Sequence, residues 1–357
     1  MSSPSSAGAV GTVGVIGGGQ LARMMVAPAI QLGIELRVLA EAEHSSASIA
    51  ATAIGDHRDP DAVLEFARGV DVVTFDHEHV PQEVLALLVA EGIAVRPGPD
   101  ALAVAQDKIV MRTRLAALGL PVPAWAAVAT TAELAAFLGE HGGVAVLKTP
   151  RGGYDGKGVR VIRSADDAAD WFALGGPLLV EELVPFRREL AQSVARRPSG
   201  ETALWPLVES IQRDGVCAEV IAPAPSSGGR EAAVAAEIAI AVADGLDVTG
   251  VLAVELFETD DERILINELA MRPHNSGHWS IEGSTTSQFE QHLRAVLDLP
   301  LGATSTVAPW TVMVNLLGGP ADGDLARPRR KALGEHPDVA VHLYGKGPAR
   351  PGRKMGH

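Results

Sequence analysis

Cysteine is almost absent from this sequence of 357 residues, which has Cys217 and no other. A single cysteine excludes an internal disulfide bond and a zinc cluster built from several cysteine thiolates. Proteins of the reducing cytoplasm commonly show this pattern, because disulfides form and persist mainly in oxidising compartments. We therefore expect a cytoplasmic protein.

The sequence also lacks the features of membrane-spanning and secreted proteins. Its apolar stretch Ala232–Leu246 is interrupted by Glu237 and Asp244, so it falls short of the roughly eighteen uncharged residues that a membrane helix needs. Residues 1–11 contain neither lysine nor arginine and are small and polar, unlike the charged start and apolar centre of a signal peptide. We predict a disordered tail there and no contact with a membrane.

Positive charge is in short supply. There are 30 Lys and Arg against 44 Asp and Glu, which gives a formal net charge of −14. Proteins that bind nucleic acid concentrate positive charge against the phosphate backbone, so a nucleic-acid partner is not expected. A small anion can still bind where a few basic side chains converge.

The first hundred residues alternate between strand and helix patterns, which predicts a doubly wound α/β domain of parallel strands over 12–99. Pro97-Gly98-Pro99 interrupts this alternation and marks the predicted end of the domain. The expected strands are 12–16, 35–40 and 71–75, and the expected helices are 20–32, 62–68 and 82–91.

In the next two hundred residues, strand and helix patterns no longer alternate regularly, which favours an α+β domain over 100–299. A long helix is predicted over 100–118, where Gly119 and two prolines end it. The expected strands are 144–148, 159–162, 178–182, 189–194, 251–257 and 264–267. From Pro300 onward the chain is rich in proline and glycine, which indicates a small C-terminal domain over 300–357.

A glycine-rich turn follows the first predicted strand. Gly17, Gly19 and Ala22 match the loose dinucleotide-binding fingerprint, and Glu41 lies where an acid would bind a ribose. This pattern alone is compatible with a nicotinamide-dependent oxidoreductase. It is equally compatible with a tight strand-to-helix turn that needs glycine, or with a helix N-terminus that binds some other phosphate.

A second glycine-rich stretch, Gly152–Gly158, joins two predicted strands directly after Lys148. It is not a Walker loop, because the sequence has no GxxxxGK[ST] motif. The backbone N–H groups of such a loop can fold over phosphates, and a lysine at the strand end can meet them as a point charge. The alternative is a flexible surface hairpin with a solvated lysine.

Two carboxylates lie inside apolar strands, Glu255 in one and Glu268 in the other, with Asn267 beside the second. An ionised carboxylate is costly to bury without a partner. A Mg²⁺ ion would remove that cost and connect the carboxylates to nucleotide phosphates. Alternatively, each glutamate points to solvent from an alternating strand.

The segment Arg272–His278 follows the second carboxylate strand and contains Arg272, His274 and Asn275. The guanidinium fork of arginine matches a small planar anion such as bicarbonate. The alternative is a polar surface loop.

Two further features have simple explanations. The run His77-Glu78-His79 offers metal ligands, but no third ligand is in range along the sequence, so we expect a polar loop at a strand end. The basic C-terminal stretch is expected to be a solvated tail, with phosphate binding by Lys346 and Arg353 as the alternative.

Taken in order, these motifs resemble the 5-(carboxyamino)imidazole ribonucleotide synthase family of the ATP-grasp superfamily, over about residues 13–357. The resemblance implies a Rossmann-like N-terminal domain, a central ATP-grasp domain and a small C-terminal domain. It also implies the ATP-dependent carboxylation of 5-aminoimidazole ribonucleotide by bicarbonate through carboxyphosphate, with ATP and Mg²⁺ bound. A homodimer and a downstream mutase are the partners that it implies. Other ATP-grasp ligases, such as a formate-using transformylase or a biotin carboxylase, are the competing assignments within the class.

The resemblance also implies roles for individual residues. The implied ATP-binding residues are Lys108, Lys148, Gly153, Tyr154, Asp155, Gly156, Lys157, Gly158, Glu181, Glu182, Leu183, Val184, Glu189, Gln212, Asn267 and Glu268. Among these, 181–184 resembles the strand that pairs with adenine, and Glu189 the acid that binds the ribose. Glu255 and Glu268 would bind magnesium, and the implied catalytic residues are Arg272, His274, Asn275 and Asp155. The ribonucleotide would contact Gln20, Glu78, Tyr154, Asp155, Lys346 and Arg353.

Three positions depart from the family pattern. Lys108 replaces the usual arginine, so a bidentate phosphate contact becomes a single one, and Gln212 replaces a histidine found in some members. Both changes are expected to alter ATP affinity and to leave the reaction intact. Relatives usually continue beyond the position of His357, so a less firmly anchored C-terminal domain is expected.

Overall fold

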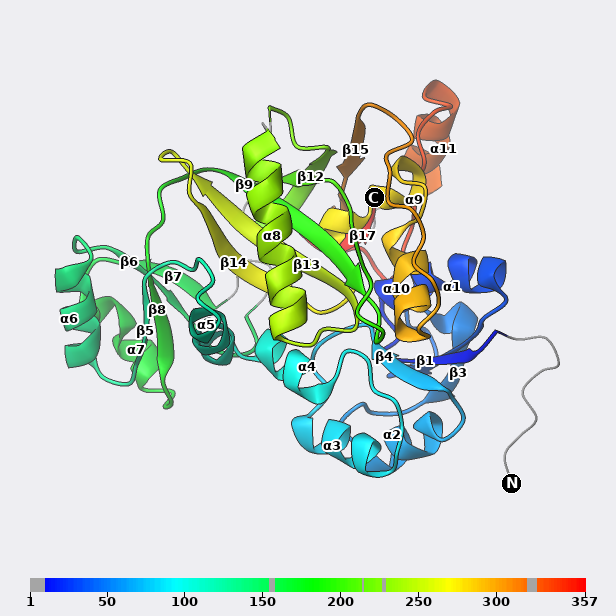
Figure 1. Cartoon of the computed structure of the whole chain (residues 1–357), viewed down its shortest axis with the longest axis horizontal. Coiled ribbons are helices and arrows are strands. Elements are labelled where there is room, and N and C mark those ends of the chain that lie inside the picture. Colours follow the sequence, from blue (N-terminus) through cyan, green and yellow to red (C-terminus); the bar gives the residue numbers. More distant parts are fainter. Residues whose placement is uncertain (1–9, 154–157, 214, 227–228, 320–325) are drawn as a thin grey trace.

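The computed structural model describes residues 10–153, 158–213, 215–226, 229–319 and 326–357. The chain forms a parallel N-terminal sheet, a small antiparallel lobe, a large antiparallel sheet and a C-terminal segment that packs beside the large sheet (Figure 1). Within the described ranges, no helix combines the length and the apolar character needed to cross a membrane.

The N-terminal sheet has the strand order β3-β2-β1-β4, and all of its pairs are parallel. The α/β prediction for this region is therefore confirmed, and the carboxyl ends of the strands meet at one edge. The strands are β1 Thr12–Ile16, β2 Glu35–Ala40, β3 Ala51–Ile54 and β4 Val72–Phe75. The helical segments are α1 Gln20–Leu32, η1 Ser48–Ala50, α2 Pro60–Ala67 and α3 Gln82–Ala90.

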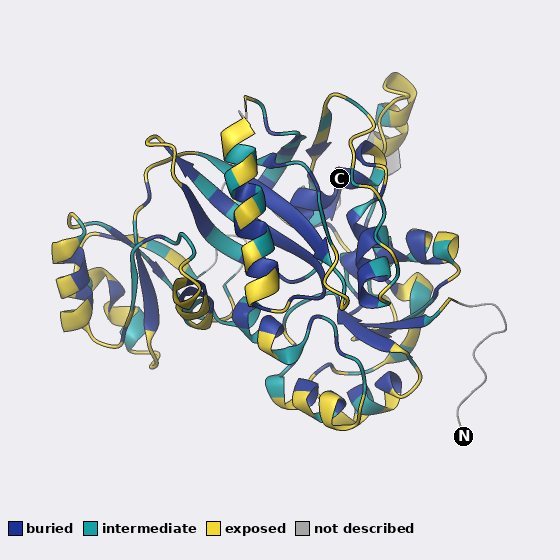
Figure 2. Cartoon of the chain, viewed as in Figure 1, coloured by how far each residue is buried: buried dark blue, intermediate teal, exposed yellow. Residues whose placement is uncertain are grey.

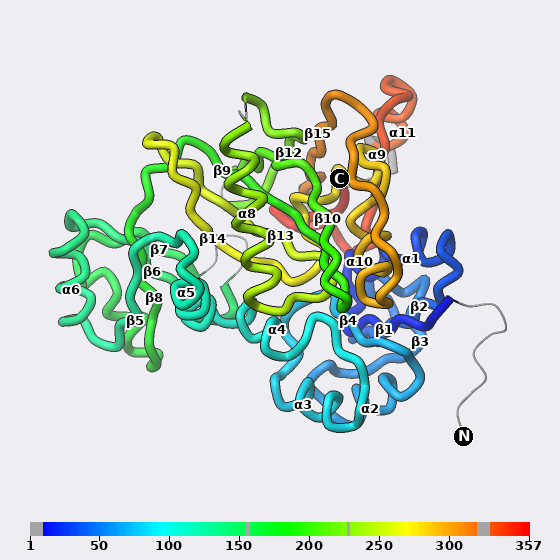
Figure 3. The backbone as a smooth tube through the Cα atoms, viewed as in Figure 1, coloured from blue at the N-terminus to red at the C-terminus, as the bar shows by residue number. Residues whose placement is uncertain are grey.

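The predicted single helix over 100–118 is wrong, because the chain forms two helices there, α4 Pro99–Gln106 and α5 Lys108–Ala117. Asp107 interrupts the helix with extended backbone angles of φ −139° and ψ 115°. Its carboxylate accepts hydrogen bonds from the N–H groups of Ile109 and Val110 at 3.0 and 3.2 Å. Asp107 thus caps α5 in place of continuing α4, which is a common preference of aspartate. The two helices lead from the N-terminal sheet toward the small lobe (Figure 3).

The small lobe is an antiparallel sheet in the order β5-β8-β6-β7, with helices packed against it. The predicted hairpin around the second glycine-rich stretch is confirmed, since β6 and β7 pair directly on either side of it. The strands are β5 Trp125–Val128, β6 Ala145–Lys148, β7 Val159–Ile162 and β8 Leu178–Glu182. The helical segments are α6 Thr131–Glu140, η2 Ala165–Ala168 and α7 Ala169–Phe172.

The large sheet runs in the order β14-β13-β9-β11-β12-β15, and β10 pairs with β9. Helix α8 lies across this sheet with its outer side exposed (Figure 2). The strands are β9 Phe186–Arg196, β10 Thr202–Leu204, β11 Val208–Arg213, β12 Val216–Ala222, β13 Gly250–Thr259, β14 Ile264–Ala270 and β15 Thr311–Val314. The helical segments are α8 Gly229–Gly245, η3 Asn275–Gly277, α9 Ser280–Gly283 and α10 Gln288–Val296.

The C-terminal segment contributes β16 Leu316–Leu317, α11 Ala326–Glu335 and β17 Lys354–Gly356, and β16 pairs with β17. Strand β15, which lies beyond the predicted boundary at residue 300, pairs with β12 and so extends the large sheet. The C-terminal segment is therefore joined to the large sheet by backbone hydrogen bonds.

The N-terminal sheet and the large sheet share one hydrophobic core. A single cluster of buried side chains joins Ile16 and Phe75 of the N-terminal sheet to Val254 and Ile266 of the large sheet. His292 of α10 connects the same two sheets, because its ring bonds the Thr74 hydroxyl at 2.7 Å and accepts from the Val251 N–H at 3.1 Å. Burial lowers the pKa of His292 to about 3, so this connection is neutral.

Candidate active site

Two carboxylates face each other across neighbouring strands of the large sheet. Glu255 of β13 and Glu268 of β14 are direct partners in the antiparallel register. Side chains of directly opposed residues lie on the same face of a sheet. The predicted common orientation of these two acids is therefore confirmed.

A β-bulge lets two consecutive residues of β14, Asn267 and Glu268, direct their side chains to the same side of the sheet. The register shifts after the Glu255–Glu268 pair, so that Leu256 pairs with Ile266 and Asn267 is the extra residue. The Lys148 ammonium lies 3.5 Å from the Asn267 side-chain oxygen. Without the bulge, strict alternation would place Asn267 on the opposite face from Glu268.

The acid pair has the electrostatics of a cation site. Burial, followed by the charges of Glu268 and Glu189, raises the pKa of Glu255 to about 8. The His274 ring lies 3.1 Å from the Glu255 carboxylate, and burial together with Arg272 lowers the pKa of His274 to about 3. A divalent cation would relieve the repulsion between the two acids, so this donor set fits Mg²⁺.

The raised pKa of Glu255 predicts a pH-dependent stability in the absence of metal. Between about pH 4.5 and 8 the folded chain keeps a proton on Glu255 that the unfolded chain has lost. Stability should therefore fall as pH rises through this window, by up to about 1.4 kcal/mol per pH unit. We expect urea unfolding without Mg²⁺ to show this slope, and Glu255→Gln to remove it. Glu237→Gln, at an exposed position on α8, should leave the slope unchanged; equal slopes in all three proteins would contradict the assignment.

A buried cluster of one acid and two bases lies beside the acid pair. Glu181 at the end of β8 forms ion pairs with Arg112 of α5 and, at 2.6 Å, with Lys148 of β6. Although burial raises the pKa of Glu181, Arg112 and Lys148 together lower it below its usual value. With two bases and one acid, the cluster carries an excess positive charge. Burial lowers the pKa of the Lys148 ammonium. An anionic ligand such as a phosphate would neutralise that excess.

Arg112 was not predicted as a site residue. It is fully buried, and its guanidinium also donates to the Asn267 carbonyl at 2.7 Å. Lys108, one helical turn earlier on α5, forms an ion pair with Glu268. The spacing of four residues between Lys108 and Arg112, on a helix entering the site, is the signal that could have found it.

The residues predicted around the adenosine lie at the end of β8 and on the same face of the large sheet as the acids. The Glu181 carboxylate is occupied by the two bases, and Glu182 accepts from the Ala124 N–H at 3.0 Å. Leu183 is exposed and Val184 is buried. Glu189 and Gln212 contact each other through their side chains, and burial raises the pKa of Glu189. Their roles toward ATP stay predictions.

The loop after β14 joins the site to the N-terminal sheet. Arg272 forms an ion pair with Glu78 at 2.7 Å and also lies close enough to Glu268 to feel its charge. The amide of Asn275 is buried beside the Cys217 thiol. Within the described ranges, neither polar atom of that amide has a hydrogen-bond partner of good geometry. A buried amide in this state is suited to bind a small polar ligand.

The first glycine-rich turn does not leave its helix end open for a phosphate. The Asp76 carboxylate accepts from the Ala22 N–H at 2.7 Å, and a side chain at Gly19 would collide with it. Glu41 accepts from the Gly18 N–H at 3.1 Å. The chain's own carboxylates therefore fill the place that a dinucleotide pyrophosphate would take, which argues against the oxidoreductase alternative.

The same turn is connected to the C-terminal segment. The Lys346 ammonium donates to the Gln20 side-chain oxygen at 2.6 Å. Arg353 is exposed, and its guanidinium donates to the Pro348 carbonyl at 3.3 Å. The structure therefore brings Gln20 and Lys346 together, while their contact with a ribonucleotide stays a prediction.

Part of the second glycine-rich stretch lies outside the described residues. This concerns the predicted site residues Tyr154, Asp155, Gly156 and Lys157. Gly153 and Gly158 are described, and the Gly158 carbonyl accepts from the Thr149 N–H at 2.9 Å. Gly158 therefore lies beside the end of β6, which carries Lys148.

Three family models match successive parts of the chain. They describe a ribonucleotide synthetase preATP-grasp domain at residues 10–106, an ATP-grasp domain at 113–289 and a phosphoribosylaminoimidazole carboxylase C-terminal domain at 311–357. The N5-carboxyaminoimidazole ribonucleotide synthase of Mycobacterium tuberculosis is 52% identical over 97% of this chain and 82% of its own length. The chain belongs to the N5-carboxyaminoimidazole ribonucleotide synthase family. This confirms the predicted three-domain ATP-grasp architecture.

Other members of the family are also similar. The synthase of Corynebacterium ammoniagenes is 50% identical over 97% of this chain and 86% of its own length. The crystal structure of the Aspergillus clavatus synthase, in complex with ADP and 5-aminoimidazole ribonucleotide, is 35% identical with a TM-score of 0.88. That match covers 97% of this chain and 92% of the other.

Proposed function

We propose that the chain is an ATP-dependent ligase of purine biosynthesis that carboxylates the amine of 5-aminoimidazole ribonucleotide. The reaction consumes ATP and bicarbonate and gives ADP, phosphate and 5-(carboxyamino)imidazole ribonucleotide. One observation carries this proposal: an opposed carboxylate pair lies between a basic cluster at Lys148 and a loop with Arg272 and the buried Asn275. This arrangement suits a nucleotide phosphate and a small planar anion placed next to each other.

In the proposed reaction, a bicarbonate oxygen attacks the γ-phosphorus of ATP and the bond to the β-phosphate oxygen breaks. Carboxyphosphate and ADP result. Carboxyphosphate then loses phosphate, and the amine of the ribonucleotide attacks the released carbon dioxide and gives up a proton. Arg272 and Asn275 would hold bicarbonate in line for attack, and Lys148 would hold the phosphates. Catalysis would come mainly from positioning and charge stabilisation.

The acid pair would hold magnesium, which would supply positive charge to offset the negative charge of the nucleotide phosphates. Glu255 and Glu268 would be its protein ligands, with the Asn267 amide beside them. The neutral His274 ring would keep the Glu255 carboxylate in orientation, because it lies 3.1 Å away from it. Lys108 would exchange its ion pair with Glu268 for a phosphate contact when ATP binds.

The ribonucleotide would bind where the N-terminal sheet, the Arg272 loop and the C-terminal segment meet. There Glu78 forms an ion pair with Arg272, and Gln20 accepts a hydrogen bond from Lys346. Lys346 and Arg353 would bind its phosphate. We also expect a homodimer in the cytoplasm and a downstream mutase that receives the product.

ADP release measured by a coupled assay tests the function. We expect release to require ATP, bicarbonate and 5-aminoimidazole ribonucleotide together, and formate not to replace bicarbonate. Asn275→Ala should raise the KM for bicarbonate about tenfold, the effect of one lost hydrogen bond, with little change in the KM for ATP. ADP release that is independent of the ribonucleotide, or that formate supports, would overturn the proposal.

A further inference from the structure

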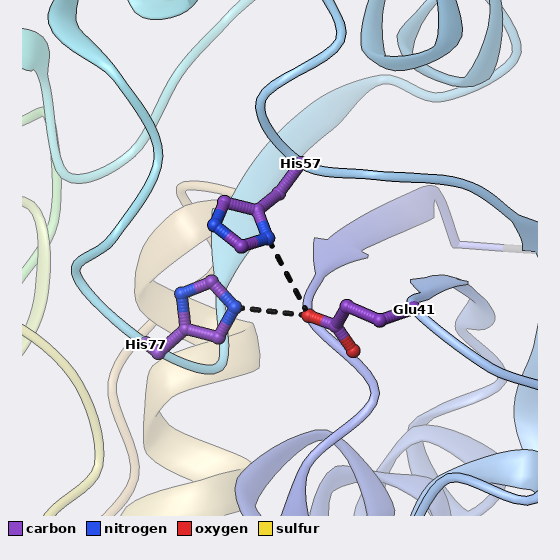
Figure 4. A group of neighbouring side chains, drawn as sticks. All are labelled: Glu41, His57 and His77. Atoms are coloured by element: carbon purple, nitrogen blue, oxygen red, sulfur yellow. Dashed lines mark hydrogen bonds and ion pairs between the residues drawn. The ribbon is translucent and has the colours of Figure 1, made fainter.

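Three side chains with metal-binding atoms converge at the carboxyl edge of the N-terminal sheet. Glu41 follows β2, His57 follows β3 and His77 follows β4, and one ligand atom of each lies within 4.8 Å of the others. Figure 4 shows both rings directed at the same carboxylate oxygen. The His77 Nε2 lies 3.1 Å and the His57 Nδ1 lies 3.7 Å from the Glu41 Oε1.

A second observation indicates that a ligand is needed in this cluster. The His57 side chain is only 10% exposed, and its Nδ1 has no hydrogen-bond partner in the described part of the chain. At 3.7 Å that atom is too far from Glu41 for a hydrogen bond but faces it. A buried imidazole nitrogen in this state has lost its contact with water without gaining a hydrogen-bond partner. A bound cation would be that partner.

We propose that Glu41, His57 and His77 bind a divalent transition-metal ion of the zinc class. Two imidazoles and one carboxylate form a donor set that favours such an ion over Mg²⁺, which prefers oxygen ligands. Tetrahedral coordination at about 2.0–2.2 Å places ligand atoms about 3.3–3.6 Å apart, so the present distances of 3.1 and 3.7 Å to Glu41 need only small side-chain movements. Three protein ligands leave the fourth position for water or for a small molecule.

The cluster is accessible to an ion from solution. The Glu41 side chain is 42% exposed and the His77 side chain is 20% exposed. The second carboxylate oxygen of Glu41, Oε2, already accepts a hydrogen bond from the Gly18 N–H, which holds this side chain in place. The site thus has an anchored carboxylate, a buried imidazole and an open side.

Binding requires one rearrangement of hydrogen bonds. At present the His77 Nδ1 accepts from the His79 N–H at 3.2 Å, so the ring proton lies on Nε2, facing Glu41. A metal ion on Nε2 would require the other tautomer, with the proton on Nδ1, and no net proton is lost from the ring. The His79 N–H is at an exposed position and would turn to water.

The site differs from the acid pair in position and in donor type. His77 is followed by Glu78, which pairs with Arg272 in the candidate active site. A metal ion on His77 would therefore fix the start of the segment that carries Glu78. The proposal itself depends only on the geometry of Glu41, His57 and His77, and not on the reaction assigned to the chain.

Equilibrium dialysis of the full-length protein against Zn²⁺ tests the site, with Mg²⁺ in large excess to occupy the acid pair. We expect one bound Zn²⁺ per chain. Glu41→Gln, His57→Gln and His77→Gln should each weaken its binding at least about tenfold, because each removes one ligand. Glu43→Gln and His44→Gln, at exposed neighbouring positions, should bind Zn²⁺ like the parent protein.

Two further measurements make the result decisive. Glu268→Gln should keep its Zn²⁺, which separates this site from the acid pair, and circular dichroism should show that each variant is folded. If His57→Gln does not fold, the solvent-accessible positions Glu41 and His77 decide the question. Zn²⁺ bound equally by both of those variants, or Zn²⁺ lost in His44→Gln or Glu268→Gln, would overturn the proposal.

Discussion

Glu268→Gln is expected to lower ribonucleotide-dependent ADP formation by about 10²–10³-fold, the usual cost of removing one charge-stabilising group from a phosphoryl-transfer site. The substitution keeps the shape of the side chain and removes its negative charge. Glu268 is opposed to Glu255 and paired with Lys108, so its loss would affect both the metal and the phosphate contact. The loss should appear in kcat, because the affected charge develops during transfer.

A matched control lies on the same β-hairpin. Glu262 is exposed and pairs with Arg230 at the surface, so Glu262→Gln should keep the parent activity. Steady-state rates at several Mg²⁺ concentrations check the assignment. A Glu268→Gln enzyme that turns over near the parent rate at every Mg²⁺ concentration would end the case for Glu268 as a metal ligand.

Arg112→Leu is expected to destabilise the fold by about 3 kcal/mol, at the lower end of the cost of breaking a buried ion pair. Arg112 is fully buried, so the substitution leaves part of the Glu181 charge and the Asn267 carbonyl without a donor. Lys148 continues to pair with Glu181, which limits the loss. Urea unfolding followed by circular dichroism gives the free energy of unfolding directly.

Arg114 on the same helix provides the comparison, because it is exposed. Arg114→Leu should change the free energy of unfolding by no more than about 0.5 kcal/mol. Equal stabilities of the Arg112→Leu and Arg114→Leu proteins would show that the buried cluster contributes little to folding.

The strands and helices of the N-terminal sheet were predictable because their patterns are short, apolar and separated by turn residues. Strand β1, helix α1 and strand β2 have the predicted bounds. Strand β3 was missed, since Ala51–Ile54 alternates between exposed and half-buried positions and contains two alanines. The break at Asp107 was missed because the apolar spacing continues through it, and only the capping hydrogen bonds of its side chain end the first helix.

The candidate site was predictable where its residues are adjacent in sequence and not where tertiary structure brings them together. The facing of Glu255 and Glu268 was predicted from two apolar strands, but the bulge at Asn267 depends on how those strands pair. His77 lies in a polar loop at a strand end, as expected, and the sequence offers no third ligand near it. Glu41 and His57 supply ligand atoms because parallel strands bring distant loops to one edge.

The glycine motif of the first turn indicates the local backbone structure, but it does not identify a bound dinucleotide. The sequence predicted a tight turn at the start of a helix, and α1 begins there at Gln20. The need for glycine at position 19 comes from Asp76, a carboxylate of the chain itself. The resemblance to a dinucleotide fingerprint therefore reflects close packing at the turn.

The shared core between the N-terminal sheet and the large sheet limits how the chain can be divided. Separate models match the two regions, yet buried side chains of both belong to one cluster, and His292 bonds to each sheet. Excising the first hundred residues would uncover Val254, Ile266 and their neighbours to water. The two regions can thus be recognised separately in the sequence, but they do not fold as independent units. A chimaera made from two relatives would have to take both sides of this shared core from the same parent.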